Sequence, residues 1–188
     1  MFSVMAFSQD AYFRALTFAA RAHGDQKTPM GLPYVVHLSC VCMEVIAALR
    51  AEPGRDEDLA VTVALLHDVV EDTTTPLGEI EAQFGPRVAA GVSALTKNKA
   101  LGKVAMEDSL ARIQGQPTEI AMVKLADRVT NLAPPPVNWP AAKVADYREQ
   151  GQLILDRLRG ASPFLSARLV ERLGVYPAGV GLPGGRGV

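Results

Sequence analysis

The chain of 188 residues has few of the features that would tie it to a membrane or to nucleic acid. It has no run of 18 or more uncharged apolar residues, so we expect no membrane-spanning helix. Its 19 basic residues are balanced by 20 acidic ones, and the net charge of −1 gives no general attraction for nucleic acid or an anionic membrane. An anionic ligand must therefore be held by a local group of cations.

Cysteine is also scarce, because Cys40 and Cys42 are the two thiols of the chain. On an expected helix they point to different sides, so we expect no disulfide between them. Residues 1–7 contain no basic segment and Asp10 follows closely, so we expect no secretory signal. A reducing, cytoplasmic location is the simplest expectation.

Alternating strand patterns are missing too, and helical patterns take their place. Hydrophobic residues make up 48% of the chain and charged residues 21%, which is typical of a globular domain. The sequence predicts an all-α fold, with one helical bundle domain over 1–176 and a mobile, Gly- and Pro-rich tail over 177–188. A polar loop is expected at 97–103. Helices are expected at about 8–23, 35–50, 56–66, 75–85, 86–96, 105–114, 117–132, 140–159 and 162–173.

The most apolar of these helices leads into a group of ionisable residues. The uncharged run 59–66 is followed by His67 and Asp68, and helical spacing places Glu71 beside His67 and Asp72 beside Asp68. Buried charges without compensation are costly, so a bound cation would explain the group. A helix end that emerges into solvent explains it equally well.

A second polar group lies on the helix expected over 117–132. Its members follow helical spacing and share one face, while apolar residues occupy the opposite face. Taken alone, this pattern is more typical of a solvent-exposed helix face than of a binding site. The members are Lys124, Asp127, Arg128 and Asn131.

The two other histidines, His23 and His37, have simple structural explanations when each is taken alone. A cation at a helix C-terminus is favoured by the helix dipole, which accounts for His23, and we leave His23 out of the site. His37 lies in an apolar stretch, as hydrogen-bonded core histidines often do.

Together, however, two imidazoles and two carboxylates from three separate helices form a nitrogen and oxygen set suited to Mn²⁺, Fe²⁺, Zn²⁺ or Mg²⁺. Such an ion would polarise a phosphorus centre and lower the pKa of a water molecule. Glu71 and Asp72 lie one turn away, where a general base must lie. The candidate metal ligands are His37, His67, Asp68 and Asp127.

Longer strings around these residues resemble the hydrolase domain of RelA/SpoT homologues, which are HD metal-dependent phosphohydrolases. The order and spacing match over about residues 8–175, and the length resembles the stand-alone small alarmone hydrolases. The strings are Ala22-His23-Gly24-Asp25-Gln26, Gly31-Leu32-Pro33-Tyr34-Val35-Val36-His37, Ala64-Leu65-Leu66-His67-Asp68-Val69-Val70-Glu71-Asp72-Thr73 and Lys124-Leu125-Ala126-Asp127-Arg128-Val129-Thr130-Asn131-Leu132.

The resemblance implies an all-helical HD fold in which the four candidate ligands bind one Mn²⁺. It implies hydrolysis of the 3′-pyrophosphate of the guanosine alarmones (p)ppGpp to GDP or GTP and pyrophosphate, with Glu71 and Asp72 activating or positioning the attacking water. The substrate contacts that it implies are Asn131, Lys99, Lys143 and Tyr147. Two diphosphate groups need further cations, for which the chain also offers Lys27, Lys97, Lys103, Lys124 and Arg128.

One position departs from the family pattern. Thr28 and Pro29 stand where the family usually has an Arg-Lys pair that frames the purine, and neither offers a guanidinium plane. An adenine alarmone or a phosphorylated dinucleotide cofactor is therefore the alternative substrate. A catalytically silent nucleotide-binding module and a purely structural bundle are the non-enzymatic alternatives, and the complete set of ligands and acids argues against a silent module.

The partner expected from these features is a small-molecule nucleotide. We expect neither nucleic acid nor a membrane as a partner. The proline run 134–136 and the long final helices offer a face for a homo-oligomer, and the sequence leaves this question open.

Overall fold

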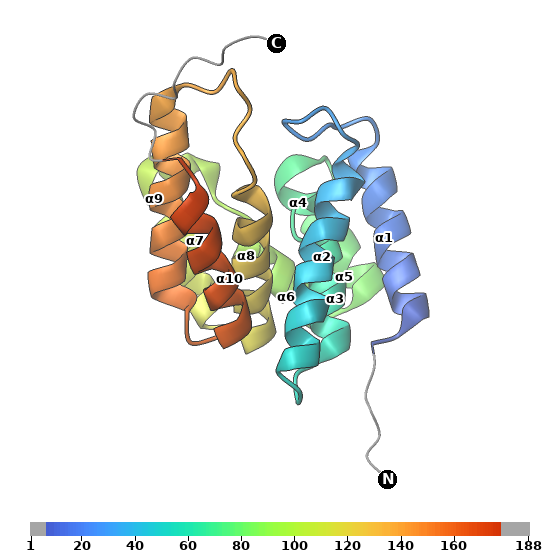
Figure 1. The fold of residues 1–188 in the computed structure, drawn as a ribbon. Helices are drawn as coiled ribbons and strands as arrows, with labels where there is room; N and C mark the ends of the chain where they lie inside the picture. The colour runs from blue at the N-terminus through green and yellow to red at the C-terminus, as the bar shows by residue number, and fades with distance from the viewer. Residues whose placement is uncertain (1–6, 178–188) are drawn as a thin grey trace.

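Helices form almost all of the regular structure in the computed structural model, which describes residues 7–177 (Figure 1). Within that range there is no β-strand, so the predicted all-α class is confirmed. Most of the predicted tail, 178–188, lies outside the described residues. The elements are α1 (Gln9–His23), α2 (Tyr34–Ala51), α3 (Glu57–Leu66), α4 (Val69–Asp72), α5 (Leu77–Phe84), α6 (Pro86–Leu95), the 3₁₀ helix η1 (Lys99–Val104), α7 (Ala105–Gln114), α8 (Thr118–Asn131), α9 (Ala141–Leu158) and α10 (Pro163–Val175).

Side-chain caps set where several helices begin. The side chains of Ser8, Asp56 and Ser162 accept hydrogen bonds from backbone N–H groups three residues later, at the starts of α1, α3 and α10. Pro86 and Pro163 occupy first helical positions, where a missing N–H costs nothing. The helix starts predicted from these residues agree with the structure to within about a residue.

Three local details differ from the expectations. The helix expected over 56–66 agrees with α3, but the chain turns at His67 and Asp68, so continuous helical spacing does not extend to Glu71 and Asp72, which lie on α4. Pro76, not Thr75, occupies the N-cap position of α5. The segment expected as a loop at 97–103 folds largely as η1, whose N-cap Asn98 accepts a hydrogen bond from the backbone of Ala100.

The centre of the bundle is formed by α2, α3 and α8. Every residue of 59–66 is buried, which fits the uncharged character of that run. The helix α8 is buried from Glu119 to Val129, so its polar face is not the solvent-exposed face that its pattern suggested. Charged groups inside the bundle therefore need partners there.

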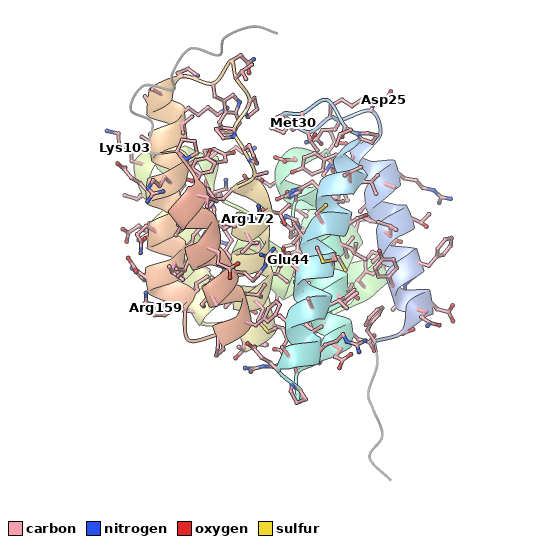
Figure 2. All side chains as sticks on the ribbon, in the orientation of Figure 1. Asp25, Met30, Glu44, Lys103, Arg159 and Arg172 are labelled. Atoms are coloured by element: carbon pink, nitrogen blue, oxygen red, sulfur yellow. The ribbon has the colours of Figure 1, made fainter. Side chains whose placement is uncertain are left out.

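By length and composition α2 alone, among the helices of the described range, could cross a membrane, but it is partly buried in the bundle. It packs against α3 and α8, and it also contacts α10. Glu44, buried on α2, binds Arg168 of α10 at 2.7 Å, and Figure 2 shows Glu44 in the seam between these helices. Such a helix is typical of a bundle core, and its composition is weak evidence for a membrane.

Two loops lie at one end of the bundle, the upper end in Figure 1. One joins α1 to α2 over residues 24–33, and Figure 2 shows Asp25 and Met30 on it. The other joins α8 to α9 over residues 132–140 and contains the proline run. Residues of both loops line one hollow. The homo-oligomer that the prolines suggested stays a prediction.

Candidate metal centre and active site

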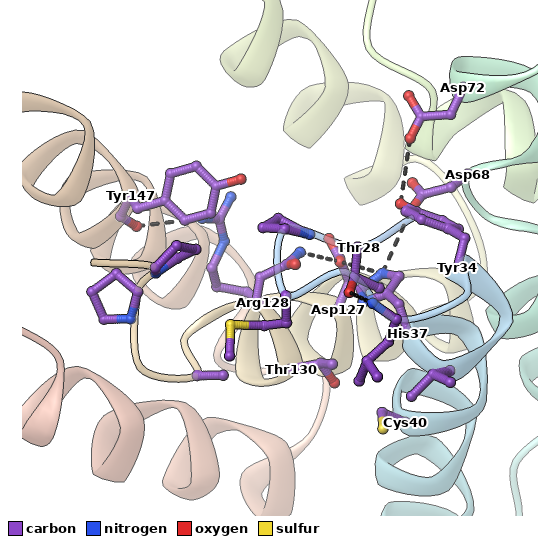
Figure 3. Close-up of a pocket in the computed structure, with 18 of the residues that line it drawn as sticks. Thr28, Tyr34, His37, Cys40, Asp68, Asp72, Asp127, Arg128, Thr130 and Tyr147 are labelled. Carbon is purple, nitrogen blue, oxygen red and sulfur yellow. Dashed lines mark hydrogen bonds and ion pairs between the residues drawn. The ribbon is translucent and has the colours of Figure 1, made fainter. Parts of the chain in front are cut away.

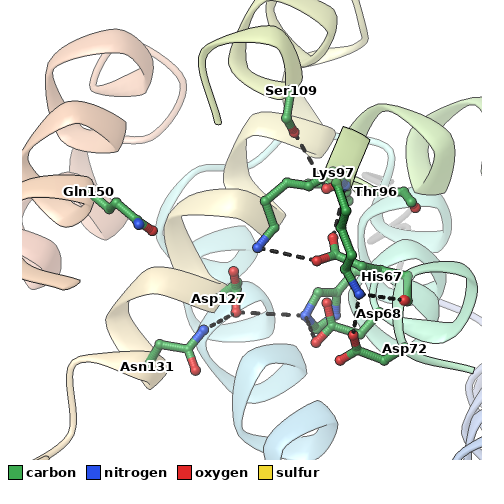
Figure 4. Close-up of polar contacts among 12 residues, drawn as sticks. His67, Asp68, Asp72, Thr96, Lys97, Ser109, Asp127, Asn131 and Gln150 are labelled. Atoms are coloured by element: carbon green, nitrogen blue, oxygen red, sulfur yellow. Dashed lines mark hydrogen bonds and ion pairs between the residues drawn. The ribbon is translucent and has the colours of Figure 1, made fainter. Parts of the chain in front are cut away.

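Two imidazoles and two carboxylates converge beside these loops (Figures 3 and 4). His37 comes from α2, His67 and Asp68 from the turn before α4, and Asp127 from α8. One ligand atom each from His37, His67 and Asp127 lie within 4.8 Å of one another. Asp68 Oδ2 lies 3.5 Å from His37 Nε2 and 3.0 Å from His67 Nε2. The structure thus brings together the four residues that the sequence suggested as metal ligands.

The ring of His67 is oriented by the backbone. Its Nδ1 lies 2.8 Å from the carbonyl oxygen of Ala64, so Nδ1 donates to that oxygen and Nε2 faces the cluster. Nε2 is buried and has no hydrogen-bond partner, although Asp68 Oδ2 and Asp127 Oδ1 lie 3.0 and 3.7 Å away. A buried nitrogen without a partner beside two carboxylates is the arrangement that a divalent cation satisfies.

The electrostatics of the cluster favour ionised carboxylates. Burial opposes ionisation of Asp68, but His67 and His37 outweigh it and hold the pKa of Asp68 well below its usual value. Burial likewise opposes ionisation of Asp127, whose pKa is lowered chiefly by Lys124 and then by His67. Burial also disfavours protonation of His67, yet the charges of both carboxylates raise its pKa. The cluster therefore concentrates negative charge around two imidazole nitrogens.

Asp127 is held at both of its oxygens by residues of its own helix. The buried ammonium group of Lys124 lies 3.1 Å from Oδ2. Asn131 Nδ2 donates to Oδ1 at 2.5 Å, a contact that Figure 4 shows. Because Lys124 is paired with Asp127, it is not a free cation for a substrate phosphate. Lys124 and Asn131 lie one turn from Asp127 on either side, which explains the spacing of this group.

Tyr34, at the start of α2, connects the cluster to the acidic pair. Its hydroxyl group donates to Asp68 Oδ2 at 2.6 Å and lies 3.3 Å from Asp72 Oδ2. The ring of Tyr34 stacks on His23 with 4.5 Å between centroids, and His23 Nδ1 lies 2.8 Å from Gln26 Oε1. His23 is therefore outside the ligand set, as expected, but it supports Tyr34 rather than simply ending a helix.

Glu71 faces Lys97 and not His67, which corrects the neighbour expected from helical spacing. The backbone N–H of Lys97 donates to Glu71 Oε2 at 2.9 Å, and its ammonium group lies 3.2 Å from Oε1. Burial disfavours the charge on Lys97, but Glu71 outweighs it and raises the pKa of Lys97. Lys99 donates to the carbonyl oxygen of Glu71 and lies 3.8 Å from Asp72 Oδ1.

A hollow of about 610 Å³ opens over the cluster. Of the predicted site residues, His67, Lys99 and Lys143 do not line it, and the ammonium group of Lys143 lies 3.9 Å from the Trp139 ring centre instead. The predicted residues that line it are His37, Asp68, Glu71, Asp72, Asp127, Lys27, Lys124, Arg128, Asn131 and Tyr147. Thr28 and Pro29, the departure from the family pattern, line it as well.

Sequence reasoning did not assign several residues that contact the cluster or line the hollow. Tyr34 had a signal, since it lies one helical turn before His37. Lys97 was expected as one of the cations for the substrate phosphates, and its pairing with Glu71 was not expected. Trp139 and Tyr176 had no signal in the sequence, because the packing of α9 and α10 brings them to the hollow.

Comparisons with known proteins agree with this geometry. The sequence pattern of the HD domain family matches residues 15–161. The guanosine-3′,5′-bis(diphosphate) 3′-pyrophosphohydrolase MESH1 of Danio rerio is 34% identical over 166 residues, which cover 83% of this chain and 88% of that protein. The Homo sapiens protein of the same name is 34% identical over 164 residues, or 82% of this chain and 88% of its own length.

A solved structure shows the same architecture. It is that of a metazoan ortholog of SpoT that hydrolyses ppGpp and plays a role in starvation responses. It superposes with a TM-score of 0.76 and 27% identity, over 92% of this chain and 99% of that chain. The chain therefore belongs to the HD domain family, and within it to the group that contains the MESH1 proteins.

Proposed function

We propose that the chain is a metal-dependent hydrolase that removes the 3′-pyrophosphate of (p)ppGpp, giving GDP or GTP and pyrophosphate. The observation that carries the proposal is the convergence of one ligand atom each from His37, His67 and Asp127 within 4.8 Å, beside a hollow that Glu71 and Asp72 line. The names of the MESH1 relatives support the same activity. A catalytically silent module would not need both the cluster and the acidic pair.

His37, His67, Asp68 and Asp127 would hold one divalent ion, for which we propose Mn²⁺. The unpartnered Nε2 of His67 and the ionised carboxylates fit such an ion, and among the described residues neither cysteine joins the His37, His67 and Asp127 group. When bound, the ion polarises the phosphorus centre and lowers the pKa of a water molecule. Lys124 and Asn131 fix the carboxylate of Asp127, which keeps the ligand oxygens in place.

Glu71 is the proposed general base. Its carboxylate is held by both donors of Lys97, so its orientation is fixed before substrate arrives. Glu71 takes a proton from water as the water oxygen bonds to phosphorus, and the ribose 3′-oxygen leaves and takes up a proton. Asp72 is positioned by Tyr34 and Lys99 at the edge of the same hollow.

A panel of nucleotides tests the proposal. Purified chain with Mn²⁺ is incubated with guanosine and adenosine alarmones and with phosphorylated dinucleotide cofactors, and released pyrophosphate and phosphate are measured. We expect pyrophosphate from ppGpp. Absence of release from every nucleotide, with metal bound, would contradict the proposal.

The second candidate is the same chemistry on an adenine alarmone or a phosphorylated dinucleotide cofactor. The loop residues Lys27, Thr28, Pro29 and Met30 line the hollow, and none offers a guanidinium plane for a purine. Faster release from adenosine substrates in the panel would favour this candidate.

A cytoplasmic location is also part of the proposal. Both cysteines are free, with Cys40 exposed and Cys42 buried on different sides of α2, as expected for a reducing compartment.

A further inference from the structure

Arg128 is a buried guanidinium group without a carboxylate partner. It is 4% exposed, and within residues 7–177 it forms no ion pair. The sequence outside that range contains neither Asp nor Glu. A buried cation is strongly disfavoured unless an anion compensates it.

Most of the donors of Arg128 are unused. Nη1 donates to the carbonyl oxygen of Tyr147 at 3.3 Å and Nη2 to Gln150 Oε1 at 3.2 Å, both of them neutral acceptors. Nε is buried and has no partner, and a guanidinium group has five N–H donors. Two of the five are therefore used.

Tyr176, after α10, adds a second unsatisfied donor. Its side chain is 4% exposed, and its hydroxyl group is buried without a partner. Tyr176, Arg128 and Gln150 all line the hollow. Burial raises the pKa of the Tyr176 hydroxyl, and the charge of Arg128 opposes this rise.

The aromatic neighbour of Arg128 explains only part of this arrangement. The guanidinium carbon lies 5.2 Å from the ring centre of Tyr147, a favourable cation–π contact, and the C-terminal turn of α8 also favours a cation. Neither gives an acceptor to Nε or to the Tyr176 hydroxyl. Two buried donors in one hollow call for an acceptor that enters from outside.

We propose that Arg128 and Tyr176, with Gln150 orienting the guanidinium group, form a phosphate-binding subsite separate from the metal cluster. Figure 3 shows Arg128 and Tyr147 at one end of the hollow and Asp68 and Asp72 at the other. The occupant is a phosphate group, either the non-reacting phosphates of the nucleotide or free inorganic phosphate. Assigning it to the nucleotide rests on the proposed function, whereas the subsite itself does not.

Calorimetric titration of the metal-loaded chain with inorganic phosphate tests the subsite. Arg128→Met removes the charge, and Tyr176→Phe removes a hydroxyl group that has no partner among residues 7–177, so we expect folding to be intact. Arg128→Met removes a charged donor and should weaken phosphate binding roughly 10- to 100-fold. Tyr176→Phe removes a neutral donor and should weaken it roughly 2- to 10-fold.

Arg172→Met is the matched control. Arg172 also has a buried Nε without a partner, but it does not line the hollow, so its titration should equal that of the wild type. Phosphate that binds only at the metal cluster would give equal titrations for all four chains. That result, or no phosphate binding to the wild type, overturns the proposal.

Kinetics with two nucleotides identify the source of the phosphate. If the subsite holds the 5′-phosphates, Arg128→Met raises KM for ppGpp but not for guanosine 3′-diphosphate, which lacks them. If free phosphate is the occupant, both KM values stay unchanged while the titration still changes. Should the wild type hydrolyse neither nucleotide, the proposed function fails, and the titration still decides the subsite.

Discussion

Two donors of Lys97 contact the carboxylate of Glu71, one from the backbone and one from the side chain. At the scale of single residues, the account assigns the proton transfer to this carboxylate. Glu71→Gln keeps an oxygen that can accept from the Lys97 backbone but removes the base. We expect bound metal to be retained and kcat to fall by roughly 10²–10⁴.

Metal content and single-turnover rates measure this effect. Glu81→Gln, an exposed position on α5, is the control and should behave as the wild type. An unchanged kcat in Glu71→Gln would mean that another group takes the proton.

Base preference is tested at Thr28. Thr28 lines the hollow, and its side chain accepts a hydrogen bond from the backbone of Leu32. Thr28→Arg adds a planar cation that stacks on a purine, so we expect a lower KM for ppGpp. Thr28→Met adds a longer side chain without a planar guanidinium group and serves as the control. Equal KM values for the two variants would show that this position does not frame the base.

At the scale of helices, close packing of α6 against the core supports the cluster. A Cβ atom at Gly91 would lie 2.5 Å from Ile120 Cδ1 and 3.2 Å from Val63 Cγ2, both in the buried core. Gly91→Ala should therefore lower the free energy of unfolding by about 1–3 kcal/mol, although alanine favours helix. Denaturant unfolding measures the change.

The same substitution in α5 is the control. A Cβ at Gly78 meets nothing within 4 Å, so Gly78→Ala should be neutral or stabilising by up to ~1 kcal/mol. Equal effects at both glycines would contradict the packing argument.

Helix positions were largely predictable because caps and prolines are local signals. Ser8, Asp56, Pro86 and Ser162 act within one turn of themselves, and the structure agrees with each. The break at His67 had no such signal. The side chains of this turn face α2 and α8, which lie far away in the sequence: Asp68 lies 3.5 Å from His37, and His67 lies 3.7 Å from Asp127.

The candidate metal ligands were grouped from residue type, burial pattern and family resemblance. The residues that contact these ligands and the acidic pair could not be grouped in the same way, since Tyr34 and Lys97 contact residues that lie 26 to 38 positions away in the sequence. Arg128 shows the same limit. Its spacing fits a solvent-exposed face, and only the packing of α9 and α10 over α8 shows that its charge is buried.

At the scale of the whole molecule, the cluster joins distant parts of the chain. Its candidate ligands come from α2, the α3–α4 turn and α8, so an ion bound there would stabilise only the folded state. A metal present at 100 times its Kd adds about 2.7 kcal/mol. Chelation should therefore lower Tm by about 5–10 °C. Asp127→Asn should show no such chelator effect, and an equal Tm of the wild type with and without chelator would contradict the account.

The most direct test measures metal stoichiometry and ppGpp hydrolysis on the same samples of wild type, His67→Ala and Asp156→Asn. Asp156 is an exposed residue of α9 away from the hollow, and Asp156→Asn controls for the effect of a substitution outside the site. The account predicts one divalent ion per chain and pyrophosphate release for the wild type and Asp156→Asn, and neither for His67→Ala. Full metal content and turnover in His67→Ala would contradict it.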